Sequence, residues 1–374
     1  MVEVFRKCFF GKIWAGFSVC FGLFCIMIKS MQNRGLFKKI FLGVGLLFVA
    51  FLIFVFIREL TPILAAIREA KWYWLVAAVL LQVATYVFLA LLFYDIFLFF
   101  GYKIIFLRLF KVSFSLNYLN QTLPSFGLSG LYFMLLVLKK DGVSAGKSII
   151  AGILYYIFIH FTFLFLLIYA FTQLFLKEQL NRLEILATLA SIALALLLVF
   201  VSIYLFRRKK LFKKILRWFI WPLRRFILPF SKNQLDREEL DKFLNVDFLI
   251  EELARNIGVL NHAKMRMLWA MVYSFLIHLF DAATLYVLFL AFNFKVSFSV
   301  AIIGFVFGSL FAFVSLIPAG IGVEEVSRGL IMAGFGVPLG IAMLASVVFR
   351  ALTFWFNIPL GIFAYKDLMK SLEE

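Results

Sequence analysis

This 374-residue sequence is short of charge and rich in apolar side chains. Only 16% of its residues are charged, whereas 64% are hydrophobic and 51 are phenylalanine. One soluble core cannot bury that much apolar surface, so the composition excludes an ordinary soluble domain. It predicts an all-α polytopic membrane protein, because a helix satisfies its own backbone groups in hydrocarbon.

Patterns for catalysis and for metal binding are also missing. The sequence contains no Gly-rich phosphate loop, no HExxH or GxSxG motif and no kinase motif. Its three cysteines, Cys8, Cys20 and Cys25, lie in one apolar segment without the spacing of a disulfide framework or a zinc site. We therefore expect no cofactor, no metal site and no enzyme activity.

Apolar segments long enough to cross a bilayer recur along the chain. They cover residues 36–57, 72–100, 147–171, 183–206, 265–292 and 339–365. Residues 9–28 are also apolar enough to insert, as an extra span, an uncleaved signal or sequence upstream of a start at Met31. We divide the chain into an N-terminal segment, 1–35, and a transmembrane domain, 36–368, with a first half, 72–206, and a second half, 265–368.

Two prolines interrupt apolar helices at corresponding positions. Pro318 follows Pro124 by 194 residues, and the same offset relates Gly142-Val143 to Gly336-Val337. Each copy reads as an apolar helix, a proline, a glycine-bearing turn and a short helix, which predicts an internal repeat with two proline-broken hairpins. The hairpins either cross the membrane or are re-entrant. The break residues expected to line a site are Pro124, Pro318, Gly320 and Gly322.

The non-membrane segment 207–264 carries opposite charges in its two parts. Residues 207–232 hold ten Lys or Arg and no carboxylate, with aromatic residues between them, and residues 236–262 are acidic and amphipathic. Basic and aromatic residues together are also typical of sites for single-stranded nucleic acid. Between two spans, however, the anionic cytoplasmic leaflet is the favoured partner, and we expect no nucleic acid.

Charge bias sets the orientation. Residues 207–266 contain 15 basic residues, and the positive-inside rule places them in the cytoplasm. Three full spans then separate the hairpins, so the first opens from the cytoplasm and the second from outside. The two copies are therefore predicted to be inverted, which is the architecture of alternating access around a wet, charged chamber.

Charged residues gather at the second break. Arg350 lies halfway along the last span and costs about 3 kcal/mol there unless it is paired. Glu324 or Glu325 is its natural partner, either as a substrate site or as a purely structural ion pair. Arg328, four residues after Glu324, can pair locally or face an anionic headgroup.

Polar side chains in the other spans are further candidates. Three amides, Asn117, Asn120 and Gln121, precede Pro124, where they can bind a polar headgroup or cap the helix. His278 and Asp281 are three residues apart on one helix face, as a proton relay or as a hydrogen-bonded structural pair.

The sequence resembles the flippase-like membrane module of lysyl-phosphatidylglycerol synthases over about residues 36–368. The resemblance is carried by Pro318 to Glu325, Gly336-Val337-Pro338, Phe349-Arg350, Trp355, Pro359 and Gly361, and upstream by Pro124 to Gly130 and Lys140 to Ser144. The family usually has glycine where Ala319 stands, and its single motif glutamate aligns with Glu325. No counterpart of the synthases' aminoacyl-transfer domain follows Tyr365, so the resemblance implies a chain without lysyltransferase activity.

The resemblance implies an inner-membrane lipid flippase whose partner is a phospholipid or another anionic or aminoacylated lipid. A cavity between the hairpins would hold the headgroup. Two other classes stay open: a non-transporting scaffold or partner of a separate lipid-modifying enzyme, and a membrane-embedded transferase that uses a lipid-linked donor. A homo-oligomer stays open as well.

Overall fold

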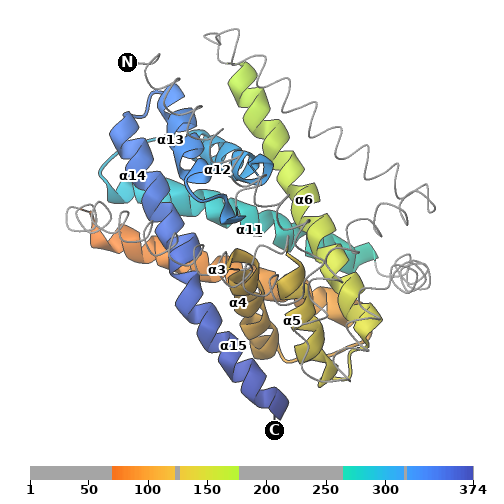
Figure 1. Cartoon of the computed structure of the whole chain (residues 1–374). Helices are drawn as coiled ribbons and strands as arrows, with labels where there is room; N and C mark the ends of the chain where they lie inside the picture. The colour runs from red at the N-terminus through yellow and green to blue at the C-terminus, as the bar shows by residue number, and fades with distance from the viewer. Residues whose placement is uncertain (1–69, 123–126, 177–263, 316–317, 374) are drawn as a thin grey trace, which may run out of the picture. The chain divides into compact units, whose positions relative to one another are not determined.

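The computed structural model describes residues 70–122, 127–176, 264–315 and 318–373, and these form helices without any β-strand (Figure 1). Pro124 lies outside the described residues. So do the N-terminal segment 1–35, the predicted spans 36–57 and 183–206, and nearly all of segment 207–264.

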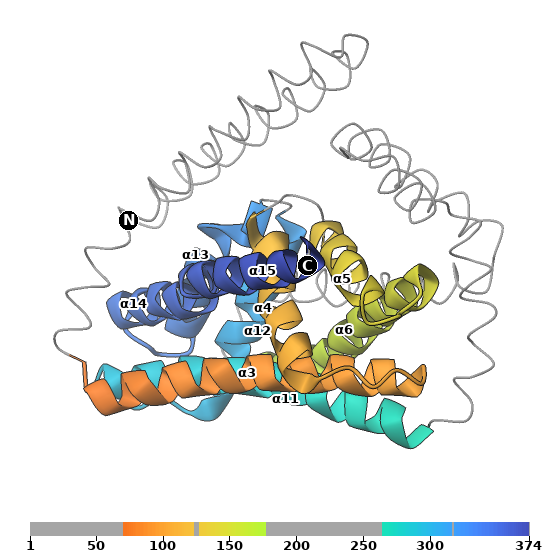
Figure 2. The ribbon, with the colours of Figure 1, turned by 90° about the horizontal axis from the view of Figure 1, so that it is seen from below.

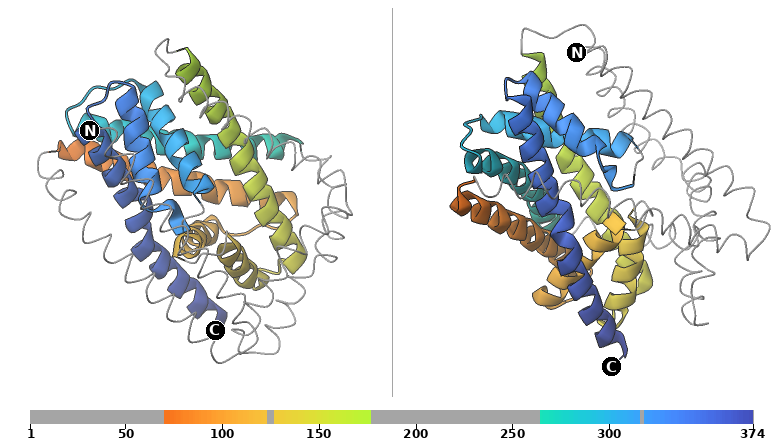
Figure 3. Two further views of the ribbon diagram at one scale, coloured as in Figure 1. Left: turned by 45° about the horizontal axis from the view of Figure 1, so that its top comes forward. Right: turned by 60° about the vertical axis from the view of Figure 1, so that its left-hand side comes forward.

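The helices follow the apolar segments closely. The first half contains α3 (Trp72–Phe99), α4 (Phe106–Thr122), α5 (Leu128–Lys139) and α6 (Ala145–Phe175). The second half contains α11 (Lys264–Ala291), α12 (Phe298–Val314), a 3-10 turn (Pro318–Gly320), α13 (Val323–Gly334), α14 (Leu339–Arg350), a π-helical turn (Ala351–Trp355) and α15 (Asn357–Glu373). The predicted final span is thus divided by the π-helical turn, and α14 runs on through it into α15 (Figure 3).

The helices have the lengths and surfaces of a membrane protein. Among the described residues, four helices are long and apolar enough to cross a bilayer: Trp72–Phe99, Gly146–Phe175, Met265–Ala291 and Leu339–Leu372. Large apolar side chains such as Ile105 and Phe363 are exposed. Such exposure is costly in water but not in lipid, so the prediction of an all-α, multi-pass membrane protein is confirmed.

The two halves share their helix boundaries. α14 begins at Leu339, 194 residues after α6 begins at Ala145, and α13 begins at Val323, 195 residues after α5 begins at Leu128. Gly142 and Gly336 both adopt positive φ, 74° and 87°, at the turn that leaves each hairpin. These helix starts and glycine turns recur at nearly the spacing of the predicted repeat, which stays a prediction.

The equivalent helices α3 and α11 lie side by side and run antiparallel (Figure 2). Lys71 N, at the start of α3, donates to Ala291 O at the end of α11, 3.0 Å away. Farther along, Gln82 Nε2 donates to Asp281 Oδ1 at 3.0 Å. Antiparallel packing is what inversion requires of equivalent helices; the inversion across the membrane stays a prediction.

Each hairpin also packs on the long helix of the other half. α4 packs along α15, and α12 packs against α6. Gly361 permits the first contact, because a Cβ there would lie 2.2 Å from Tyr118 Cβ. At the edge of the same contact, Lys111 and Asp367 form an ion pair of 2.6 Å. The two halves are therefore interlocked through their broken helices.

Candidate functional site

The second break is built from left-handed backbone. Gly320 has φ 63°, and a Cβ there would lie 2.5 Å from Ala312 Cβ. Gly322 has φ 82°. Immediately before them, Ala319 adopts φ 56°, a conformation that costs a residue with a Cβ about 1–2 kcal/mol. A glycine at this position would adopt the same turn without that cost.

Glu325 closes the start of α13. Its Oε2 accepts a hydrogen bond of 2.7 Å from Gly322 N, one of the backbone donors that a helix leaves unpaired at its N-terminus. Glu324 and Glu325 both stand in the first turn, where the helix dipole favours negative charge. The break therefore presents two carboxylates on a short, fixed helix.

Arg350 joins both carboxylates to the break. Its Nη1 donates to Glu324 Oε2 at 2.5 Å, and its Nη2 donates to Ala319 O. Its Nε lies 3.1 Å from Glu325 Oε1, an ion pair whose atoms are not aligned for a hydrogen bond. The guanidinium also lies over the Phe354 ring, 4.5 Å from its centre. Both glutamates, rather than one of them, are thus partners of Arg350.

Arg328 is the most deeply buried charge of the site. None of its surface is exposed, and its Nη2 donates to Glu324 Oε1. Its Nε and Nη1 have no hydrogen-bond partner among the residues that the structure describes. The guanidinium is 4.4 Å from the centre of the Phe349 ring, and Gly308 of α12 leaves it room, since a Cβ there would lie 3.0 Å from Nε. Glu324 therefore bridges two arginines.

The four charges form a closed cluster. Arg328, Arg350, Glu324 and Glu325 balance in formal charge, and none is more than 9% exposed. Our expectation of a wet, open chamber differs from this arrangement, in which the groups pack on one another and on aromatic rings. Removing one member of such a buried set leaves an uncompensated charge, which costs about 3–5 kcal/mol.

The first break is held by neutral groups. Asn120 Oδ1 accepts from Gly130 N at 3.0 Å, and its Nδ2 donates to the Tyr156 hydroxyl at 3.4 Å. That hydroxyl in turn donates to Gly127 O at 3.3 Å. Gly127 has φ 84°, and a Cβ there would lie 1.8 Å from the Tyr156 hydroxyl oxygen. Asn120 thus fastens α4 to the start of α5.

The other two amides also have protein partners. The Asn117 side chain hydrogen-bonds the hydroxyl of Tyr86. Gln121 Nε2 donates to Thr353 O at 3.3 Å, and its Oε1 accepts from Asn357 Nδ2 at 3.0 Å. In this closed arrangement, the three amides connect helices instead of facing one shared space.

Gln121 reaches the π-helical turn, which the sequence analysis missed. Thr353 lies within that turn, two residues before its end at Trp355. The available signal was Pro359, which has no N–H to donate to the carbonyl oxygen four residues earlier. Such insertions in a helix are frequent at functional sites. Here the turn follows Arg350 directly, so it connects the charged cluster to the first hairpin.

His278 and Asp281 have separate partners. His278 Nε2 is 2.9 Å from Ile159 O. Asp281 Oδ1 accepts from Gln82 Nε2 at 3.0 Å and from the Thr85 hydroxyl at 3.4 Å. The structure does not bring the two side chains into a direct relay. Sequence reasoning missed Gln82 and Thr85, although polar residues three apart in an apolar helix share one face and mark a buried polar contact.

Comparison with known proteins finds one matching family model and two similar membrane proteins. The model described as "Lysylphosphatidylglycerol synthase TM region" matches residues 40–361. A "UPF0104 membrane protein" of Methanothermobacter thermautotrophicus is 24% identical over 214 residues, which are 57% of this chain and 61% of that protein. Another protein of that name and organism is 37% identical over 90 residues, 24% of this chain and 27% of its own length. The chain thus spans less than two thirds of either relative.

Proposed function

This chain belongs to the family of lysylphosphatidylglycerol synthase transmembrane regions, and from that premise we propose that it moves a phospholipid or a lipid-linked headgroup between leaflets, without enzyme activity of its own. The observation that carries the proposal is the cluster of Arg328, Arg350, Glu324 and Glu325, buried at a helix break in an apolar bundle. Ionisable groups inside a membrane typically mark a substrate or ion path.

The cluster offers the chemistry that a lipid headgroup requires. Arginine binds phosphate as it binds carboxylate, through paired N–H donors. A headgroup phosphate can therefore replace Glu324 on Arg350 or Arg328, and an amine on the headgroup can pair with the released carboxylate or with Glu325. Each exchange replaces one ion pair with another, so no charge is left alone in the low-dielectric interior.

Access requires the closed cluster to open. We propose that the hairpins rock against α15 and α6, the long helices on which they pack, and expose the cluster to one leaflet at a time. In this proposal the protein lies in the inner or plasma membrane with residues 207–264 in the cytoplasm, where the basic part contacts anionic lipid. The Gly320 and Gly322 break is where the second hairpin would bend.

A leaflet-resolved assay in proteoliposomes tests the proposal. We expect wild type to speed the exchange of a labelled anionic phospholipid between leaflets, and Arg350→Lys and Glu325→Gln to abolish it while the protein stays monodisperse. Lysine keeps the charge of Arg350 but cannot hold two partners in a planar fork. Arg108→Lys is the matched control, because Arg108 pairs with Asp141 at 2.7 Å at the edge of the bundle.

Each other outcome favours a different function. If wild type moves no lipid, the protein is a scaffold or a partner of a lipid-modifying enzyme. A covalently altered lipid in the same vesicles would indicate a membrane-embedded transferase. Exchange that persists in both cluster variants would mean that the substrate passes elsewhere.

A further inference from the structure

A second polar site lies between α3 and α11, apart from the charged cluster. Asp281 is half-buried there, ten residues before the end of α11, or about 15 Å along the helix. Gln82 Nε2 donates both to Asp281 Oδ1 and to the Thr284 hydroxyl, each at 3.0 Å. Thr85 adds a hydrogen bond of 3.4 Å. Figure 2 shows the two helices side by side along this stretch.

Asp281 has no cation for a partner among the described residues. Its Oδ1 is held by an amide and a hydroxyl, which are neutral, and its Oδ2 accepts no hydrogen bond from any described residue. A carboxylate at this depth is costly unless it is paired, and binding a proton removes the charge. The side chain is only half-buried, so part of its surface stays accessible for proton exchange.

The described titratable groups around Asp281 are neutral or already have partners, so Asp281 is the group among them that can accept a proton. Tyr86 on α3 and Tyr155 on α6 face it as neutral phenols. On α11 itself, His278 is occupied by Ile159 O. Helix α12 contains no titratable residue, and the single one of α14, Arg350, is paired with the glutamates. The charges of Arg328 and Glu324 on α13 act on Asp281 through space.

We propose that Asp281 binds and releases a proton at Oδ2 and thereby couples lipid movement to a proton gradient. The inference rests on the proposed function. A proton from water adds to the carboxylate to give a neutral carboxyl group, and on release the electron pair of the O–H bond stays on the oxygen. The site thus gains or loses one unit of negative charge without any other reactant.

Arg328 is the group whose ion pairs respond to this change in charge. Within the described part of the chain, its Nε and Nη1 lack hydrogen-bond partners, whereas its Nη2 donates to Glu324. A charged Asp281 offers Arg328 a further anion and weakens its hold on Glu324. A protonated Asp281 leaves the hold of Arg328 on Glu324 at full strength. Proton binding therefore biases the ion pairs that a headgroup must exchange.

Infrared spectroscopy tests the proton site without any lipid transport. We expect reconstituted wild type to show the carbonyl band of a protonated carboxyl group that disappears as the pH is raised. Asp281→Asn, which is nearly isosteric, should lack this band, and Asp281→Glu should retain it at a shifted frequency. A spectrum that Asp281→Asn leaves unchanged overturns the proposal.

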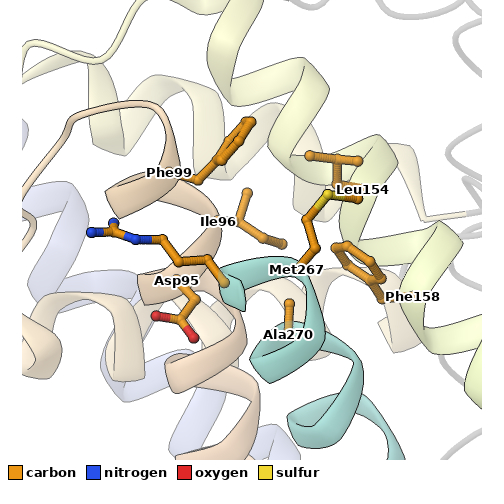
Figure 4. Close-up of a pocket in the computed structure, with 8 residues that line it drawn as sticks. Asp95, Ile96, Phe99, Leu154, Phe158, Met267 and Ala270 are labelled. Atoms are coloured by element: carbon orange, nitrogen blue, oxygen red, sulfur yellow. The ribbon is translucent and has the colours of Figure 1, made fainter. Parts of the chain in front are cut away.

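Asp95→Asn is the matched control. Asp95 is on α3 near its C-terminal end, beside Arg266 in a shallow recess that Ile96, Phe99 and Met267 help to line (Figure 4). Arg266 lines the same recess, so Asp95 represents a carboxylate with a cation nearby. We expect the infrared band of the protonated carboxyl group to persist in this variant.

Transport under an imposed gradient tests the coupling. Wild type should accumulate labelled lipid in one leaflet when the two sides differ in pH, and an ionophore that collapses the difference should abolish the accumulation. Asp281→Asn should equilibrate lipid without accumulating it. Accumulation in that variant, accumulation driven by a sodium gradient, or wild-type exchange that ignores the pH difference would overturn the coupling. Wild type that moves no lipid would instead refute the proposed function, and the infrared result would still decide the proton site.

Discussion

In both hairpins, the long helix that follows supplies a donor to the carbonyl oxygen at the break. Tyr156 of α6 donates to Gly127 O at 3.3 Å, and Arg350 of α14 donates to Ala319 O. These two donors are 194 residues apart, so they occupy equivalent positions of the repeat. A phenol performs in the first half what a guanidinium performs in the second.

The acceptors at the start of the short helices differ in the same way. The neutral amide of Asn120 accepts from Gly130 N in the first hairpin, and the carboxylate of Glu325 accepts from Gly322 N in the second. Uncharged partners fasten a break without needing a counterion. Charged partners also hydrogen-bond the break, but they can exchange one counterion for another. In the proposed function, the exchange of ion-pair partners is therefore assigned to the second hairpin.

The largest expected effect comes from removing the charged donor. Arg350→Met leaves Glu324 and Glu325 with Arg328 alone, and we expect the free energy of unfolding to fall by about 3–5 kcal/mol because a buried charge loses its partner. Denaturant titration in mixed micelles measures it. Arg108→Met, at the edge of the bundle, should cost about 1 kcal/mol or less. Equal losses in the two variants would remove the distinction between a buried cluster and a peripheral pair.

Next in size is the coupling between Arg328 and Glu324. Each single change, Arg328→Met or Glu324→Gln, should destabilise the fold, because each breaks the hydrogen-bonded ion pair between them. The double variant should be more stable than the sum of the singles predicts, by about 1–3 kcal/mol, as for residues in one network. A double-mutant cycle of unfolding free energies measures the coupling. Strict additivity would show that the pair contributes nothing.

A smaller effect is expected for the equivalent residue of the first hairpin. Tyr156→Phe removes the hydroxyl that joins Asn120 to Gly127 O. One neutral hydrogen bond contributes about 0.5–1.5 kcal/mol, so the loss of unfolding free energy should fall in that range. A loss as large as that of Arg350→Met would mean that the neutral and the charged contacts contribute equally to the free energy of unfolding.

The smallest effect concerns the backbone of the second break. Ala319→Gly removes the strain of φ 56°, and we expect a gain of about 0.5–1 kcal/mol after the greater entropy of an unfolded glycine is subtracted. Ala345→Gly is the control, since Ala345 is a buried position within α14 and should lose about 1 kcal/mol. Destabilisation at both positions would contradict the strain.

Much of the fold could be predicted because hydrophobic length and local breaks determine it. The approximate helix spans and the meeting of Arg350 with the glutamates follow from the sequence of apolar runs and from the cost of an unpaired charge. Arg350 was expected to pair with one glutamate. It takes both, because Glu325 also caps α13 and Glu324 bridges to Arg328.

The remaining contacts depend on how distant helices meet. Gln82 reaches Asp281, 199 residues away, and Gln121 reaches Thr353, 232 residues away. Periodicity gives the face on which such residues lie but not the partner opposite them. The closed state of the cluster could not be predicted either, because an apolar sequence with buried charges is compatible with both a closed and an open arrangement.

The most direct test of the contrast between the hairpins is the rate of leaflet exchange of a labelled anionic phospholipid in vesicles that contain Tyr156→Phe or Glu325→Gln. Each variant changes few atoms at the break of one hairpin. We predict that Tyr156→Phe retains most of the wild-type rate and that Glu325→Gln loses it. Equal rates in the two variants, whether both high or both absent, would contradict the assignment of lipid exchange to the charged hairpin.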